Sequence, residues 1–401
     1  MFKINRYNPK TNIKITLIFV LFYFISMIFS YSGLDSSTTL LAFTISMSFF
    51  LIDTKLGLIS LLIFVKWLVL SEMIYPLNPG GDAASYYNFM LSIDSLVDGI
   101  YQIYIRLISH INTLIAAGGF LYWVPANFLH SNDMYLLTFV NHMLLFVGSI
   151  LFVKTLLHLK LLRKKYYYVA ILLINFSPLI NQYNSWLLKE TIVLFFVGLT
   201  VYYYYVKRNY LVVALLILLA STVRPYFPII FASYWYLLRD KHSRKLFIVL
   251  ISAELVFLYI YSGGMFNIGL LLKNALISWG AFLASPNFLR TSNWSGAPLA
   301  TLEALIVTLS YGMLLFSKSK LKYIVFQSLI LYSLALGQMA VMADLSNFQT
   351  NRNALTKVSV GRKKLPIMFI NYFVLLLLYE RFRIRGKTSF IYSSQKEKFD
   401  S

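Results

Sequence analysis

Twelve apolar runs, separated by polar or basic segments, constrain this chain more than any other feature of its sequence. A helix needs about 20 apolar residues to cross a bilayer, and the runs reach or approach that length. They cover residues 15–33, 36–52, 56–75, 134–157, 166–181, 191–206, 210–222, 226–239, 246–262, 300–316, 323–343 and 367–380. Because 59% of the residues are hydrophobic and only 13% are charged, a water-soluble globular fold is excluded.

We therefore predict an all-α, polytopic integral membrane protein with about twelve transmembrane helices. Its outer loops should carry short amphipathic or re-entrant helices. Residues 1–388 should form a single integral membrane domain, and residues 389–401 a disordered cytoplasmic tail. The first apolar run lacks a small-residue cleavage site, so we expect it to be a retained helix and not a signal peptide.

The basic residues predict the orientation of the chain in the membrane. Lys and Arg accumulate on the cytoplasmic side, and the N-terminal segment is basic. With the N-terminus inside, most of the 36 Lys and Arg fall on the inner side and both termini are cytoplasmic. This holds if residues 111–128 form a re-entrant or interfacial segment. The net charge of +21 then reflects topology, and no nucleic-acid partner is expected.

The chain has no Cys and five scattered His, which excludes a disulfide framework and a thiolate metal site. We expect neither a metal nor a cofactor. Three segments assigned to the outer side are long, at residues 76–133, 263–299 and 344–366, and such loops are where chemistry is usually placed. The first contains a predicted amphipathic helix over residues 83–108, with apolar side chains near helical spacing.

Arg224 marks a break between the short apolar runs 210–222 and 226–239. Pro225 disfavours helix at the residue before it, and the guanidinium needs water, protein or an anionic ligand around it. An Arg near the membrane is by default a functional hypothesis, although a snorkelling interfacial Arg beside a proline kink is the alternative. Glu190 begins the run one hairpin earlier, so Glu190 and Arg224 could face the same cavity. A Lys189–Glu190 interfacial cap explains that pair equally well.

Several further cations break the positive-inside pattern, and five of them lie in the segment 344–366. Such a cluster either binds anionic headgroups, holds a phosphate or pyrophosphate, or is a solvated loop. The cations that we assign to binding are Lys189, Arg290, Arg352, Arg362 and Lys363.

Asp82 follows the turn Asn78-Pro79-Gly80-Gly81 and precedes Tyr86 and Tyr87. A carboxylate at this position suits a general base for a sugar hydroxyl, and the two tyrosines suit contacts with the sugar. An N-cap for the helix that starts at Ala83 is the alternative.

This pattern resembles the Wzy-type polymerases of bacterial O-antigen and capsule repeat units, and more widely the GT-C class of lipid-dependent glycosyltransferases. The resemblance rests on the layout of about twelve spans and on short motifs in the outer segments. These are Gly81-Asp82 with Tyr86-Tyr87, Leu188-Lys189-Glu190, Arg224-Pro225-Tyr226 and Gly361-Arg362-Lys363-Lys364-Leu365-Pro366. It implies a multi-pass enzyme of the bacterial inner membrane in lipopolysaccharide or capsule biosynthesis. Its substrate would be an undecaprenyl-pyrophosphate-linked oligosaccharide on the periplasmic side.

The residues themselves suit such chemistry. Arg224, with Arg352, Arg362 and Arg290, could stabilise the pyrophosphate leaving group, and Asp82 or Glu190 could be the base. Besides membrane lipids, a chain-length regulator protein is an expected partner. Two other functions stay open: a flippase for lipid-linked oligosaccharides, and a GT-C or acyl transferase that decorates a surface glycan. A flippase would gather its charges between two similar halves, and no repeat is present here.

Overall fold

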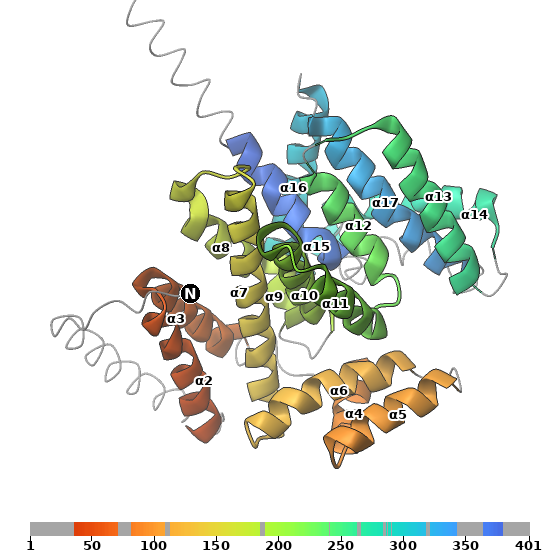
Figure 1. The fold of residues 1–401 in the computed structure, drawn as a ribbon. Coiled ribbons are helices and arrows are strands. Elements are labelled where there is room, and N and C mark those ends of the chain that lie inside the picture. The colour runs from red at the N-terminus through yellow and green to blue at the C-terminus, as the bar shows by residue number, and fades with distance from the viewer. Residues whose placement is uncertain are drawn as a thin grey trace, which may run out of the picture. The chain divides into compact units, whose positions relative to one another are not determined.

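The computed structural model describes residues 36–70, 82–108, 113–184, 189–239, 241–262, 266–283, 286, 288–289, 291–317, 321–342 and 364–379. These residues form helices and their connections, with no strand among them (Figure 1). The all-α prediction is therefore confirmed. The first apolar run and the tail 389–401 lie outside the described residues.

The chain divides into two compact units. Unit 1 comprises residues 1–151, 175–203 and 209–225, and unit 2 comprises residues 152–174, 204–208 and 226–401. The predicted single membrane domain over 1–388 stays a prediction.

Unit 1 carries ten of the helical segments of the described chain, some of which extend past its borders. They are α2 Ser36–Ser48, η1 Phe49–Leu51, α3 Thr54–Val69, α4 Asp82–Leu91, α5 Leu96–Ile108, α6 Thr113–Phe128, α7 Met134–His158, α9 Pro178–Asn184, α10 Glu190–Tyr202 and α11 Tyr210–Val223. α7 continues into unit 2 after Leu151. An aromatic core holds α3 against α7: the Trp67 ring lies 5.2 Å from that of Phe139, and its Nε1 donates to Thr138 Oγ1 at 2.9 Å.

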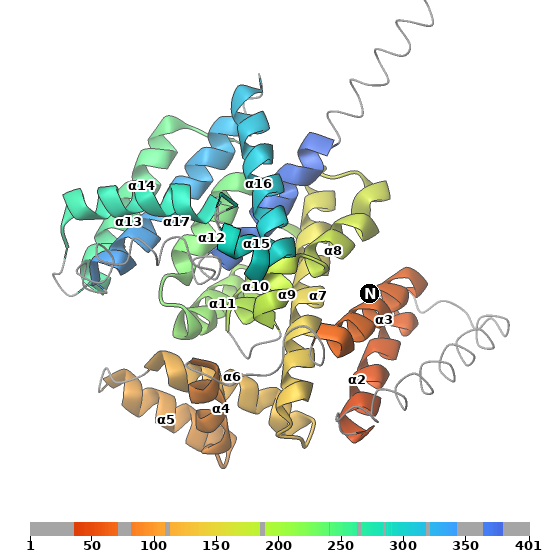
Figure 2. The same cartoon turned by 180° about the vertical axis from the view of Figure 1, so that it is seen from behind.

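The three helices α4, α5 and α6 pack together, as both ribbon views show (Figures 1 and 2). Gly118 and Gly119 of α6 permit this packing, because a β-carbon at Gly118 would lie 2.8 Å from the Tyr86 ring and one at Gly119 2.8 Å from the Tyr86 carbonyl oxygen. Phe89, Ile93 and Ala116 form the centre of the group. The two glycines therefore fix the position of Tyr86.

Unit 2 contains the later helices and the end of α7. They are η3 Lys164–Tyr166, α8 Tyr167–Asn175, η4 Tyr203–Lys207, α12 Phe227–Leu238, α13 Arg244–Tyr261, α14 Ile268–Leu283, α15 Thr291–Gly296, α16 Pro298–Phe316, α17 Leu321–Met342 and η6 Leu365–Ile367. The last of these opens an apolar helix, Leu365–Tyr379. α14 and α13 both pack on α17 (Figure 2).

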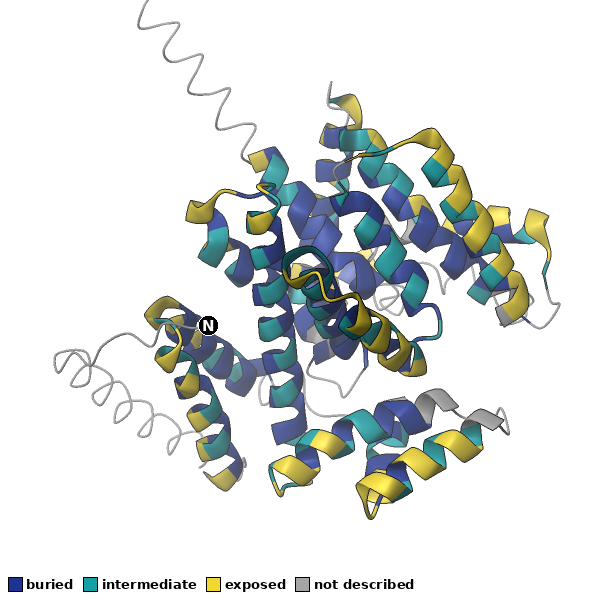
Figure 3. Ribbon diagram, in the orientation of Figure 1, coloured by how far each residue is buried: buried dark blue, intermediate teal, exposed yellow. Residues whose placement is uncertain are grey.

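By length and composition, two helices of the described chain could cross a membrane, Met134–His158 and Pro298–Phe316. Five shorter apolar helices accompany them: Ser37–Leu51, Tyr210–Val223, Phe227–Leu238, Ile268–Ile277 and Leu365–Tyr379. Along most of its length α7 is buried, whereas α13 exposes one side (Figure 3). The number of spans, about twelve in our prediction, stays a prediction.

The structure differs from the expected helices at three places. The helix expected over 83–108 is broken at residues 92–95, because the Ser95 hydroxyl accepts the Asp98 N–H at 3.1 Å and caps a new helix. The run 166–181 is broken before Pro178, where Ser177 caps α9 through the Ile180 N–H at 3.1 Å. α14 occupies part of the expected loop 263–299.

Candidate functional site

Helices α10 and α11 have nearly equal lengths and pack on each other within unit 1. α10 begins at Glu190, and Arg224 follows the last residue of α11. Arg224 has the extended backbone (φ −137°, ψ 100°) that a following proline favours, and its N–H still bonds to Ala220 O at 2.9 Å. The start of one helix and the end of the next thus meet.

Glu190 and Arg224 form a buried ion pair between Glu190 Oε1 and Arg224 Nη2. Glu190 is completely buried and Arg224 is 7% exposed. The carboxylate lies in the first turn of α10 and the guanidinium at the end of α11, so each charge also opposes the partial charge of its helix terminus. The structure brings together the two residues that the sequence suggested could share a cavity.

Lys189 lies next to this pair and contacts Tyr86 of α4. Its Nζ is 5.4 Å from the centroid of the Tyr86 ring, and both side chains are buried. A cation over an aromatic face is attracted by the ring quadrupole. Two predicted site residues from distant parts of the sequence are therefore in contact.

A layer of buried polar groups supports the start of α10. Thr191 donates to Asn184 Oδ1, and Asn184 Nδ2 lies 3.3 Å from His142 Nδ1 on α7. All three side chains are buried. Buried polar groups linked in this way hold one conformation, so the network fixes the backbone that carries Glu190.

Lys66, which lies inside an apolar run, is held by the segment before α10. Its Nζ donates to Asn175 O at 2.7 Å and to Asn181 Oδ1 at 2.8 Å, and it lies 5.2 Å from the Phe176 ring centroid. Asn175 Nδ2 in turn donates to Ser149 Oγ at 2.8 Å. These bonds explain how an ammonium is accommodated among apolar helices.

Tyr87 is directed away from this cluster, since neighbouring residues on a helix point in different directions. Its hydroxyl donates to Asn132 O at 2.8 Å. Burial and then the nearby Asp133 carboxylate raise the pKa of the Tyr87 phenol, which keeps it a neutral donor. The bond ties α4 to the segment before α7, and the role of Tyr87 in substrate binding stays a prediction.

Asp82 is the first residue of α4, which agrees with a position at the helix N-terminus, although its side chain is not among those described. The predicted binding residues Arg290, Arg352, Arg362 and Lys363 lie outside the described residues. Within the described part of the chain, no three His, Asp or Glu side chains are grouped so that they could hold a metal ion.

Unit 2 contains a buried polar cluster that the sequence did not indicate. Lys364 is completely buried beside Glu303 of α16, and Tyr372 donates to Glu303 Oε1 at 2.7 Å. Burial lowers the pKa of Lys364 to about 8, although Glu303 acts in the opposite direction. In sequence Lys364 is one of a run of loop cations, and only the fold distinguishes it from its neighbours.

Comparisons of the chain with protein-family models, with curated proteins and with solved structures gave no match.

Proposed function

We propose that this chain is a repeat-unit polymerase of bacterial O-antigen or capsule biosynthesis, a glycosyltransferase of the inner membrane. It transfers a growing glycan from undecaprenyl pyrophosphate onto a new lipid-linked repeat unit on the periplasmic side. The observation that carries the proposal is the buried contact between Glu190 and Arg224, which joins a carboxylate to a cation suited to a diphosphate.

In this proposal the ion pair is the resting state of the site. An arriving pyrophosphate competes with Glu190 for the Arg224 guanidinium, which offers several donors in a fixed fork. Lys189, adjacent to Glu190 in the chain and in contact with the Tyr86 ring, is a second cation for the same pyrophosphate. The leaving group is thereby stabilised, and Glu190 is released from Arg224.

The released carboxylate then serves as the general base. It accepts the proton of the acceptor hydroxyl as the hydroxyl oxygen forms a bond with the anomeric carbon of the growing chain. The bond from that carbon to the pyrophosphate oxygen breaks, and undecaprenyl pyrophosphate leaves with the electron pair. Asp82 is the other candidate for the base.

Deleting the gene and resolving the surface glycan by size tests this function. A polymerase predicts loss of the ladder with one repeat unit still attached. Complete loss of surface glycan would indicate a flippase, and an unchanged ladder with altered composition would indicate a decorating transferase.

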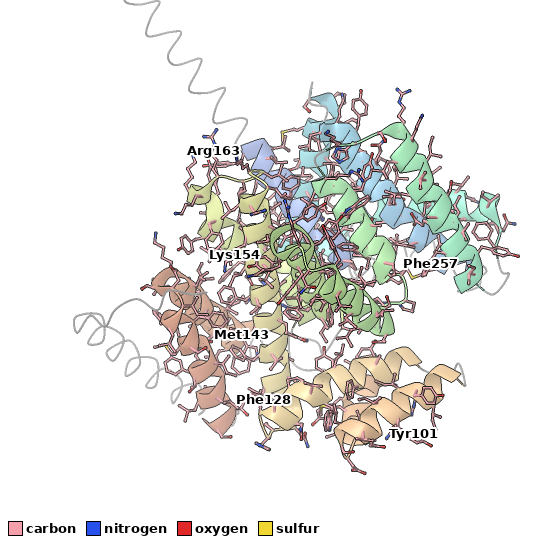
Figure 4. All side chains as sticks on the ribbon, viewed as in Figure 1. Tyr101, Phe128, Met143, Lys154, Arg163 and Phe257 are labelled. Carbon is pink, nitrogen blue, oxygen red and sulfur yellow. The ribbon has the colours of Figure 1, made fainter. Side chains whose placement is uncertain are left out.

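Complementing the deletion with Arg224→Ala tests the site. The variant should remain in the membrane and yield only single repeat units, whereas Arg163→Ala, which changes an exposed arginine labelled in Figure 4, should restore the ladder. A normal ladder from Arg224→Ala would remove Arg224 from the mechanism.

A further inference from the structure

Helix α5 presents an uninterrupted apolar stripe to the outside of the α4–α6 group. Its members occupy two adjacent positions in each helical turn, and all are exposed: Leu96 by 53%, Val97 by 76%, Ile100 by 54%, Tyr101 by 59%, Tyr104 by 58% and Ile105 by 45%. Tyr101 is labelled in Figure 4. We call these six residues the α5 stripe, and none of them is charged.

The polar residues of α5 lie on its other side, toward α4 and α6. Gln102 Nε2 donates to Asp98 Oδ2 at 2.9 Å, and the Arg106 guanidinium lies 4.6 Å from the centroid of the Phe89 ring on α4. These three side chains are less exposed than the stripe. An amphipathic helix in water has the reverse arrangement, with its apolar side against the protein.

We propose that the α5 stripe is a membrane-binding surface, inserted into the boundary between headgroups and acyl chains of one leaflet with α5 parallel to the membrane plane. From Leu96 to Ile105 the stripe is only about 14 Å long, so it cannot cross a hydrocarbon core of about 30 Å. An uncharged apolar face opposite polar residues is typical of a helix that lies in the interface. Tyr101 and Tyr104 are residues that prefer this depth.

A phospholipid surface is favoured over a second copy of the chain by the composition of the stripe. Tyr101 and Tyr104 lie among aliphatic side chains, as aromatic residues do in the interfacial belt of membrane proteins. The stripe has no charged side chain that would give a protein interface its direction, and its polar side-chain atoms are limited to the two tyrosine hydroxyls. The inference stands without the polymerase proposal. If both hold, Tyr86, on the helix that packs with α5, lies near headgroup depth, where a lipid-linked pyrophosphate would be found.

Single cysteines can test this surface, because the chain contains no other Cys. Val97→Cys and Tyr104→Cys place a label on the stripe, and Asn88→Cys places one on an exposed polar position of α4 as the matched control. Each full-length variant would be labelled with an environment-sensitive fluorophore and reconstituted into vesicles of phosphatidylcholine and phosphatidylglycerol.

The stripe labels should show blue-shifted emission, quenching by lipids that carry a nitroxide near the top of the acyl chain, and loss of quenching by aqueous iodide. The label at residue 88 should show the reverse. Iodide quenching of the stripe labels equal to that of the control would overturn the proposal. Protection from both quenchers, together with disulfide crosslinking between copies, would also overturn it and assign the stripe to an interface between two chains.

Discussion

Gly198 of α10 lies directly against Gly148 of α7: a β-carbon added at Gly198 would be 2.8 Å from the Gly148 carbonyl carbon. The neighbouring atoms belong to backbone and cannot rotate aside. The close approach holds the helix that begins with Glu190 against the helix that carries His142.

Gly198→Ala should therefore destabilise unit 1, because the added methyl group overpacks the contact between α7 and α10. We expect the free energy of unfolding to fall by about 3 kcal/mol. Chemical unfolding of the purified protein in detergent measures the effect. Gly312→Ala in α16 is the matched control, since nothing lies within 4 Å of its added β-carbon, and it should gain up to about 1 kcal/mol from helix propensity. Equal stability of the two variants would show that α7 and α10 are not in backbone contact.

If one member of the Glu190–Arg224 pair is replaced by alanine, the charge of the other member stays buried but loses its ion-pair partner. Arg224→Ala should cost about 3–5 kcal/mol, and Glu190→Ala a similar amount. The double variant should lose clearly less free energy of unfolding than the sum of the two single losses, because neither charge of the pair then remains buried. A double-mutant cycle by unfolding in detergent measures this coupling. Additive losses would mean that the two side chains do not interact.

The contact between Lys189 and Tyr86 depends on the aromatic ring and not on the hydroxyl. Tyr86→Phe should keep the contact, whereas Tyr86→Leu should lose about 1–2 kcal/mol of cation–π attraction at this buried position. In a Lys189→Met background the difference between the two tyrosine variants should shrink. The same difference in both backgrounds would assign the effect to packing against Gly118 alone.

Stability should rise with pH through the titration of Lys364. Its pKa is about 8 in the folded protein, against 10.5 when exposed, so the unfolded chain binds more protons between these values. Below about pH 8 the buried Lys364 carries its charge, and the full cost of burying an ammonium lowers the free energy of unfolding. As the pH rises toward 10.5 the buried amine becomes neutral, and the free energy of unfolding increases by about 3 kcal/mol.

Unfolding midpoints at several pH values between these limits would reveal the slope. Lys364→Met should abolish it, and Lys273→Met, which removes an exposed lysine, should leave it unchanged. A slope that persists in Lys364→Met would assign the pH dependence to another group.

Helix positions were largely predictable from the sequence, because apolar runs and proline positions are local signals. The end of α11 at Val223 follows from Pro225, and the expected run 134–157 matches α7 at Met134–His158. The break at residues 92–95 was missed because the apolar spacing continues through it, while the Ser95 cap that interrupts the helix is a single hydrogen bond.

The contacts within the candidate site were predictable only in part. Helices α10 and α11 form a hairpin and have nearly equal lengths. The start of α10, with Glu190, therefore lies near the end of α11, with Arg224. The contact of Lys189 with Tyr86 joins segments about 100 residues apart in sequence, and no local pattern indicates it. The burial of Lys364 is of the same kind, since its neighbours in sequence are also cations.

Helix α7 has a consequence for how this protein can be divided. It is one continuous helix from Met134 to His158, yet its residues up to Leu151 belong to unit 1 and those from Phe152 to unit 2. A cut at this border would sever a helix and expose the apolar ends of both halves. The border therefore lies inside a continuous helix, and limited proteolysis should not cleave the chain between Leu151 and Phe152.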